Sequence, residues 1–489
     1  MKNSLKITLL LILGIALFIL PNKVFAGTYG QLTYEIKDDD TVAIKDCDEN
    51  ATSITVPSKI AGYPVTEIYG SIASGAAFED CTKLESVTLP SSVEEIGCNA
   101  FYNCTSLKSI TIPKKVKEIQ YNTFQNCTSL TNVTIPESVT EIQSDAFNGC
   151  TSLQSITLPN SLEDIGGGCF ENCTSLKSIK IPSKIKELRY GTFMNCKNLS
   201  SVSLPYDMRT LGYCVFQGCT SLTSITLPKK LTAIDGDCFR DCTNLKNVTI
   251  KGYITNISGY AFKDCTSLSK VTIYRTDYLY IADDAFEDTN ANISFNVVKG
   301  SDAYKWALNN DKKYTVIKVP LSYCYSSKTS NKKYTGKAIK QSITVKYCDN
   351  DLVNGTDYKI SYKNNKYVGK ATMTITGIGN YTGTITKTFK INPNSVSIKS
   401  LSAISKGFTA KWGLRTTQTT GYQIQYATNS KYTNNVKKIS VKSNKTTSKK
   451  FTKLKASKKY YVRIRTYKTV NGVKYYSAWS KSKTVTTKK

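Results

Sequence analysis

The sequence predicts a solenoid of 23-residue repeats with short parallel strands, followed by two all-β sandwich modules. Three residue types keep one spacing along the repeat array, and no insertion interrupts them. A fixed period of this size is typical of a solenoid, in which each unit contacts only its neighbours. The markers are a cysteine from Cys81 to Cys265, a proline from Pro90 to Pro228 and a phenylalanine from Phe101 to Phe262.

One repeat begins with Leu107-x-x-Ile110-x-Ile112, which is the L-x-x-L-x-L pattern of a leucine-rich repeat. Ile110 and Ile112 alternate with Thr111 as a short strand requires, and Pro113 ends that strand. About eight apolar side chains per repeat each stabilise by roughly 1.5–3 kcal/mol when buried. Ordering the repeat costs roughly 1.5 kcal/mol per residue. One repeat alone therefore does not fold, and neighbouring repeats must bury its faces.

The full motif, Ala/Thr-Phe-x-x-Cys-x-x-Leu-x-x-Ile-x-Ile-Pro, resembles the BspA-like subfamily of bacterial leucine-rich repeats over residues 66–290. The resemblance implies a secreted or surface-attached protein, often an adhesin or host-interaction protein. It implies no reaction.

Residues 1–26 have the pattern of a secretory signal peptide. A basic start is followed by an apolar run at 7–20, and a small-residue pattern predicts cleavage between Ala26 and Gly27. The run is short for a membrane span, so no span is expected in the mature chain. The alternative is an uncleaved N-terminal anchor.

A solenoid needs caps over its two open ends. Residues 27–65 are predicted to form the first cap, with strands at 34–36 and 41–44 around an acidic turn at 38–40. That turn lacks the glycine and distal glutamate of a calcium loop and is expected to be solvated. Residues 291–316 are predicted to form the closing cap, with Trp306 and Leu308 covering the last repeat.

Residues 317–392 alternate short apolar and polar runs between glycine and asparagine turns, which predicts a β-sandwich. The segment resembles the small Ig-like modules of Gram-positive surface proteins.

Residues 393–489 resemble a fibronectin type III module. Trp412 follows an alternating strand, Leu454 and Tyr460 have the spacing of a tyrosine corner, and a Tyr-Ser-Ala-Trp-Ser segment ends the pattern. This fold assigns no function by itself.

Charge is distributed unevenly along the chain. Of the net charge of +30, residues 393–489 contribute 23 Lys and Arg with no Asp or Glu. Residues 317–392 contribute +10, which leaves −3 for residues 1–316. A tail of this kind attracts polyanions, and salt weakens the attraction. The expected partner is an anionic cell-wall polymer, and nucleic acid is not expected for an exported chain. The alternative is that the lysines only keep the module soluble.

The repeat cysteines stack with a strand spacing of about 4.8 Å, and parallel side chains keep their Cβ atoms farther apart than the ~3.8 Å of a disulfide. They are therefore expected to be buried free thiols. No histidine and no second cysteine pair at zinc spacing accompanies them, so no metal is expected. Cys324 and Cys348 form a candidate disulfide, which the sequence leaves open.

The absence of histidine excludes Ser-His-Asp and Cys-His catalysis. No phosphate-binding glycine loop and no G-x-S-x-G motif occurs. A carboxylate pair for glycoside hydrolysis stays open, but the array carboxylates fit a solvated face. Examples are Glu118, Glu141, Glu163 and Glu187. We therefore predict a protein that is not an enzyme and binds no cofactor.

The outward strand positions of the repeats are polar and form a candidate ligand surface. It comprises Lys108, Ser109, Thr111, Thr131, Asn132, Thr134, Gln154, Ser155, Thr157, Lys177, Ser178 and Lys180. The row either hydrogen-bonds an extracellular protein or glycan, or its threonines only stack as cross-strand pairs. The sequence predicts a secreted or cell-surface bacterial binding protein. The alternatives are a structural matrix protein and a glycan-binding accessory to a degradative enzyme.

Overall fold

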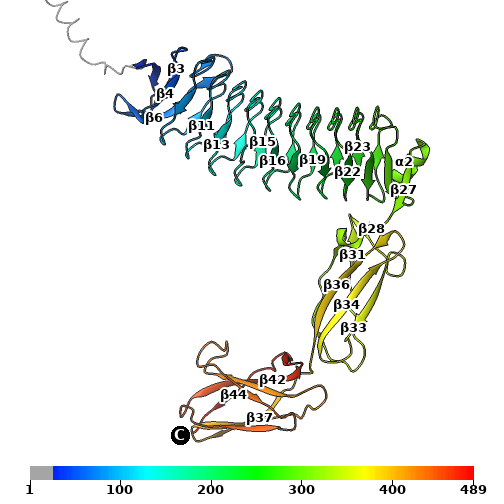
Figure 1. The fold of residues 1–489 in the computed structure, drawn as a ribbon. Coiled ribbons are helices and arrows are strands. Elements are labelled where there is room, and N and C mark those ends of the chain that lie inside the picture. The colour runs from blue at the N-terminus through cyan, green and yellow to red at the C-terminus, as the bar shows by residue number, and fades with distance from the viewer. Residues whose placement is uncertain (1–25) are drawn as a thin grey trace, which may run out of the picture. The chain divides into compact units, whose positions relative to one another are not determined.

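A computed structural model describes residues 26–489 of the chain (Figure 1). The predicted signal peptide lies outside the described residues, apart from Ala26 at its end. The chain divides into two compact units, Met1–Ile317 and Lys318–Lys489. The first unit contains the repeat array, and the second is built mainly from antiparallel strands.

The first unit starts with an antiparallel sheet that leads into the array. Strand β2 pairs with β3 around the acidic turn that the sequence predicts, and β3 then pairs in parallel with β6. Within the turn, the carboxylate of Asp39 accepts hydrogen bonds from the Thr41 amide and hydroxyl, so the turn satisfies its own polar groups. The sheet contains β1 (Ala26–Tyr29), β2 (Leu32–Ile36), β3 (Val42–Cys47), β5 (Lys59–Ile60), β6 (Tyr63–Ile68) and β10 (Glu95–Ile96). The strands β7 (Gly70–Ser71) and β8 (Gly75–Ala76) pair with each other in a separate sheet.

The predicted repeat strands line one face of the solenoid, where the outward side chains alternate with buried Ile or Val. They are β4 (Ser53–Thr55), β9 (Ser86–Thr88), β11 (Ser109–Thr111), β13 (Asn132–Thr134), β16 (Ser178–Lys180), β18 (Ser201–Ser203), β20 (Ser224–Thr226), β22 (Asn247–Ile250) and β24 (Lys270–Ile273). The repeat at 155–157 differs from the prediction because it forms no strand, although its sequence keeps the pattern.

A second row of parallel strands, each two residues long, runs along another face of the same repeats. The sequence predicts this part only as the return path to the next long strand. The strands are β10 (Glu95–Ile96), β12 (Glu118–Ile119), β14 (Glu141–Ile142), β15 (Asp164–Ile165), β17 (Glu187–Leu188), β19 (Thr210–Leu211), β21 (Ala233–Ile234), β23 (Asn256–Ile257) and β25 (Tyr280–Ile281).

The core of the array is a column of phenylalanine rings. Each ring from Phe78 to Phe286 stacks on the ring of the next repeat, with centroids 4.9–5.7 Å apart. The marker cysteine lies three residues later, and its Sγ donates a hydrogen bond to the phenylalanine carbonyl of the preceding repeat. From Cys104 to Cys265 these eight distances are 2.9–3.3 Å. The marker position therefore needs a small side chain that fills the core and also donates a hydrogen bond to this carbonyl.

The turn after each phenylalanine needs a residue with left-handed backbone geometry. Asn103, Asn126 and Asn172 have φ of 57°, 61° and 59°, and Gly149 has φ of 74° at the equivalent place. Asparagine and glycine tolerate this region better than other residues. The asparagines of the repeat are thus explained by the turn.

The closing cap consists of β26 (Ser294–Val298), the helix α2 (Asp302–Asn309) and β27 (Tyr314–Ile317). The Ser301 hydroxyl caps α2 by accepting from the Tyr304 amide at 3.1 Å. Trp306 covers the end of the ring column, with its centroid 5.7 Å from Phe286 and 5.2 Å from Phe295. The prediction for Leu308 is wrong: the helix turns this side chain outward, and it is 44% exposed.

The first half of the second unit contains three small sheets, with β34 and β36 forming the longest antiparallel pair. Its core includes Tyr347, Met373 and Ile375. The elements are β28 (Val319–Pro320), the short helix η1 (Leu321–Tyr323), β29 (Tyr325–Ser326), β30 (Lys332–Lys333), β31 (Val345–Tyr347), β32 (Asn350–Asp351), β33 (Tyr358–Lys363), β34 (Gly369–Gly377), β35 (Tyr381–Thr382) and β36 (Thr384–Asn392).

The second half contains a sheet ordered β37-β38-β41 and a sheet ordered β40-β39-β42-β43, with β44 also on β42. Trp412, Tyr422 and Tyr460 lie in the core that the two sheets share. The strands are β37 (Ile398–Ile404), β38 (Gly407–Trp412), β39 (Gly421–Ala427), β40 (Lys437–Val441), β41 (Ser448–Phe451), β42 (Lys459–Val470), β43 (Val473–Tyr476) and β44 (Lys483–Thr486).

Candidate binding surfaces

The polar strand row that the sequence singles out is exposed along its whole length. All twelve predicted residues, from Lys108 to Lys180, lie in the exposed class. Parallel register places equivalent residues side by side, with Ser109 beside Asn132 and Thr111 beside Thr134. We call this row the Ser/Thr face.

The three columns of the Ser/Thr face differ in how much of their hydrogen-bonding capacity the array itself uses. In the first column, the Thr131 hydroxyl donates to the Lys108 carbonyl at 3.1 Å. In the same column, the Lys108 ammonium pairs with Glu85 at 2.6 Å and Lys177 donates to Gln154 at 3.2 Å. The second and third columns, which begin at Ser109 and Thr111, contribute hydroxyl and amide groups at the surface. These two columns therefore stay the candidate ligand surface.

The second row of strands carries a column of carboxylates, which the sequence predicts only to be a solvated face. The parallel pairs place Glu67 beside Glu95, Glu118 beside Glu141, and Glu141 beside Asp164. We call Glu67, Glu95, Glu118, Glu141, Asp164 and Glu187 the carboxylate column. The sequence signal for this column is an acidic residue at every 23rd position from 118 to 187.

Glu163 does not belong to this column, because Asp164 takes the place of the repeat. Its carboxylate pairs instead with Lys184 at 2.6 Å. Glu163 is exposed, as expected for a solvated face, but it lies one residue before the column position.

Basic side chains neutralise the carboxylate column at its two ends. Lys37 pairs with Glu67 at 3.0 Å, and Arg189 lies 3.2 Å from both Asp164 and Glu187. In the middle, the Gln143 amide donates to Glu118. Burial, followed by the neighbouring charge of Glu67, raises the pKa of Glu95. Glu118 and Glu141 still lie side by side in parallel register, so like charges are adjacent in the central part of the column.

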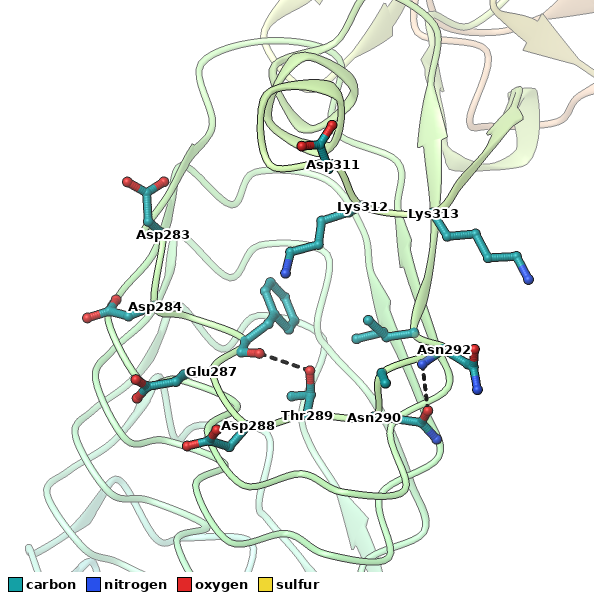
Figure 2. Close-up of a pocket in the computed structure, with 13 residues that line it drawn as sticks. Asp283, Asp284, Glu287, Asp288, Thr289, Asn290, Asn292, Asp311, Lys312 and Lys313 are labelled. Carbon is teal, nitrogen blue, oxygen red and sulfur yellow. Dashed lines mark hydrogen bonds between the residues drawn. The ribbon is translucent and has the colours of Figure 1, made fainter.

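A pocket of about 800 Å³ opens beside the last repeat, between it and the start of β27. Figure 2 shows Asp283, Asp284, Glu287 and Asp288 along one edge, and Lys312 and Phe286 also line the pocket. Lys263 already pairs with Glu287 at 2.5 Å and reaches Asp288 at 3.8 Å. Across residues 26–489, no group of three or more Cys, Asp or Glu side chains is arranged to hold a metal ion.

The environment of the repeat thiols disfavours the reactive thiolate form. Burial is the main cause that raises the pKa of Cys173 and of Cys265 to about 12, and it raises that of Cys150 and Cys196 as well. A reactive cysteine needs the opposite shift, because the thiolate is the nucleophile. The cysteine ladder therefore has a structural role.

Cys324 follows the short helix η1 and is half-buried, while Cys348 is buried with φ of 52°. The bond between them stays a prediction. Within the part of the chain that the structure describes, no helix has both the length and the apolar character needed to cross a membrane.

Residues 318–489 display the basic charge that the sequence predicts. Lysines are exposed on several strands of this unit, for example Lys370 on β34, Lys411 on β38 and Lys438 on β40. Lys346 pairs with Asp351 at 3.3 Å, and the segment after residue 392 contains no acidic residue that could form such a pair. This unit is a second candidate surface, which would select its partner by charge.

Comparison with known proteins identifies the array. Residues 71–200 and 186–311 match the family described as BspA type leucine rich repeat region (6 copies). A search of curated proteins gave no match.

Three solved structures are similar to the chain. A leucine-rich repeat protein of T. pallidum is 36% identical, with 40% of this chain and 90% of that chain covered and a TM-score of 0.38. A leucine-rich repeat protein from Bacteroides ovatus is 23% identical, with 60% and 100% covered and a TM-score of 0.38. The pneumococcal vaccine antigen PcpA is 18% identical, with 60% and 99% covered and a TM-score of 0.35. Through residues 71–311, the repeat array matches the BspA-type leucine-rich repeat family.

Proposed function

We propose that the protein is an exported, non-enzymatic binding protein of the bacterial cell surface. In this proposal the Ser/Thr face binds an extracellular protein or glycan, and the basic second unit associates with an anionic cell-wall polymer. The observation that carries the proposal is the exposed, register-aligned Ser/Thr face on a BspA-type solenoid. The predicted signal peptide at residues 1–26 supports export.

The chemistry of the Ser/Thr face suits a polar ligand. Its hydroxyl and amide groups donate and accept hydrogen bonds, and they come from a regular sheet rather than from loops. Short Ser and Thr side chains also lose less conformational entropy on binding than long ones. A partner with repeating polar groups, such as a glycan or a protein edge, matches such a surface.

We further propose that residues 317–392 are an Ig-like module and that residues 393–489 are a fibronectin type III module. The paired sheets of the second half and its buried Trp412 support the latter assignment. The Tyr460 hydroxyl also accepts from the Lys455 amide at 3.3 Å, as a tyrosine corner requires. Both modules serve as a basic anchor in this proposal.

The test has two arms, both with the secreted full-length protein. The first measures its retention on purified cell walls over a salt series, and we expect release as salt rises. The second screens glycans and extracellular proteins for saturable binding, and then compares Thr134→Glu with Asn160→Glu. Both changes add one negative charge at an exposed site of the array, but only Thr134 lies on the Ser/Thr face.

We expect Thr134→Glu to abolish binding in the screen and Asn160→Glu to preserve it. Equal effects of the two variants would show that the Ser/Thr face is not the site. Binding to polysaccharide alone favours a glycan-binding accessory, and no saturable ligand favours a structural matrix protein.

A further inference from the structure

One face of the second unit carries two arginines stacked between aromatic rings. Arg463 and Arg465 alternate along β42, so both side chains lie on one face of the sheet. The guanidinium of Arg463 lies 3.9 Å from the ring centroid of Tyr432 and 4.8 Å from that of Trp479. The guanidinium of Arg465 lies 4.3 Å from Trp479 and 3.8 Å from Tyr476. We call these five residues the arginine–aromatic stack.

Buried glutamines of the neighbouring strand hold both guanidinium groups in place. Arg463 Nε donates to Gln425 Oε1 at 2.8 Å. Arg465 donates from Nε and Nη2 to Gln423 Oε1 at 2.9 and 2.6 Å. Gln423 and Gln425 are only 9% and 4% exposed. The arginines are therefore fixed before any ligand arrives.

Two serines fix the segment that carries Trp479. The Ser477 hydroxyl accepts from the Thr466 amide at 3.1 Å, and the Ser480 hydroxyl accepts from the Ile464 amide at 3.1 Å. These bonds tie the segment to β42 on both sides of Trp479. The ring thus stays between the two guanidinium groups.

The charge of the stack is not balanced by carboxylates of its own module. Residues 393–489 contain no Asp or Glu. In the solenoid, by contrast, Arg189 lies 3.2 Å from Asp164, and Arg240 lies 3.2 Å from Asp237. Burial, ahead of the nearby charge of Arg463, lowers the pKa of Arg465. Two half-buried cations therefore face each other across one indole ring, and an anion would relieve their repulsion.

We propose that the arginine–aromatic stack is an oxyanion site that binds the phosphate or carboxylate groups of an anionic surface polymer. A guanidinium offers five N–H donors, of which the glutamines use one on Arg463 and two on Arg465. Its planar fork matches carboxylate and phosphate geometry. Because the arginines are already ordered, binding loses little side-chain entropy. The inference rests on the proposed function, in which the basic unit contacts an anionic polymer, and it assigns that contact to the arginine–aromatic stack.

The test uses the three tryptophans of the full-length protein as separate reporters. The protein is labelled with 5-fluorotryptophan, and each 19F signal is assigned by a Trp→Phe variant. Inorganic phosphate, poly(glycerol phosphate) and polygalacturonate are then titrated separately. We expect a saturable shift of the Trp479 signal only, because Trp412 is 2% exposed in its core and Trp306 lies in the other unit. The two polymers distinguish a phosphate from a carboxylate source.

A matched pair of variants separates the stack from general lysine attraction. Arg465→Lys keeps the charge but loses the planar fork, and we expect it to weaken polymer binding by about tenfold. Lys450→Gln removes one exposed charge from the other sheet, and we expect a change of less than about twofold. An unchanged Trp412 signal shows that each variant is folded.

Three results would overturn the proposal. They are the absence of a Trp479 shift with every anion, equal losses for Arg465→Lys and Lys450→Gln, and tighter binding of single-stranded DNA than of either polymer. A saturable Trp479 shift without retention on cell walls would leave the oxyanion site standing and reject the wall-anchor part of the proposed function.

Discussion

Raising the pH should unfold the solenoid through its buried thiols. Eight cysteines, from Cys104 to Cys265, donate Sγ hydrogen bonds in the core. Burial is the largest cause that raises the pKa of each of them in the folded chain. A raised folded pKa means that the stabilisation is complete below the unfolded pKa and is lost as pH rises above it.

The size of this loss follows from proton linkage. An unfolded thiol titrates near its ordinary pKa of about 8.5, so one pH unit above that value each buried thiol loses about 1.4 kcal/mol of stability. Burial raises the pKa of Cys169 and Cys238 in the same core as well. Ten thiols acting together lose about 14 kcal/mol, which is comparable to the whole stability of a typical domain at about 5–15 kcal/mol. The solenoid should therefore unfold at a pH near 9.5.

The assay is urea unfolding under reducing conditions at a series of pH values from 7.5 to 10, followed by hydrogen exchange in peptides of the array. The slope of unfolding free energy against pH gives the number of protons released on unfolding. We expect about ten protons above the unfolded thiol pKa, because Cys169 and Cys238 are counted with the eight donors, and about one fewer in Cys196→Ala. A slope of fewer than about three protons would refute the reasoning. Thiols that stay protonated in the folded core must release their protons on unfolding, and so many thiols would give a larger slope.

Three further predictions concern other parts of the chain. Phe193→Ala removes a fully buried ring with stacked neighbours on both sides, and it should lower the free energy of unfolding in urea by about 3–5 kcal/mol. The exposed control Tyr206→Ala should lower it by less than about 0.5 kcal/mol. Similar losses for the two variants would contradict the stabilising role of the ring column. Glu118→Gln removes one of the like charges in the carboxylate column, and it should raise the free energy of unfolding by about 0.2–1 kcal/mol at pH 7 and low salt. This gain should vanish at high salt. A gain that persists at high salt would point to another cause. Peptide mapping without reduction should recover Cys324 and Cys348 as one linked peptide, and recovery of both as free thiols would reject the disulfide.

The repeat period was enough to predict which residues of the long strands point inward. Ile110 and Ile112 are buried and Thr111 is exposed because a strand alternates its side chains and a solenoid has one interior. The second strand row was not predictable in this way, because a pair such as Glu118–Ile119 is too short to show alternation. The outward turn of Leu308 depends on the helix α2, which lies where the repeat period has ended.

The arginine–aromatic stack shows a different limit of sequence reasoning. Tyr432, Arg463 and Trp479 come from three separated segments, and no local spacing connects them. Their contact follows from the pairing of β39, β42 and β44 and from the loops that this pairing brings together. The sequence shows the alternation of Arg463 and Arg465 and the Tyr-Ser-Ala-Trp-Ser segment that holds Tyr476 and Trp479, but it does not show that the two meet.

The charge pattern separates two kinds of recognition within one chain. In the solenoid, ion pairs between repeats neutralise many exposed charges, as for Lys108 with Glu85 and Lys115 with Glu94, both at 2.6 Å. What the Ser/Thr face offers a partner is then mainly hydrogen-bond geometry, on which salt has little effect. In the proposed function, the second unit would attract an anionic polymer through unbalanced charge, which salt screens. As the salt concentration rises, the protein should therefore be released from the cell wall first and from the ligand of the Ser/Thr face later. Release from both at one salt concentration would mean that charge governs both contacts.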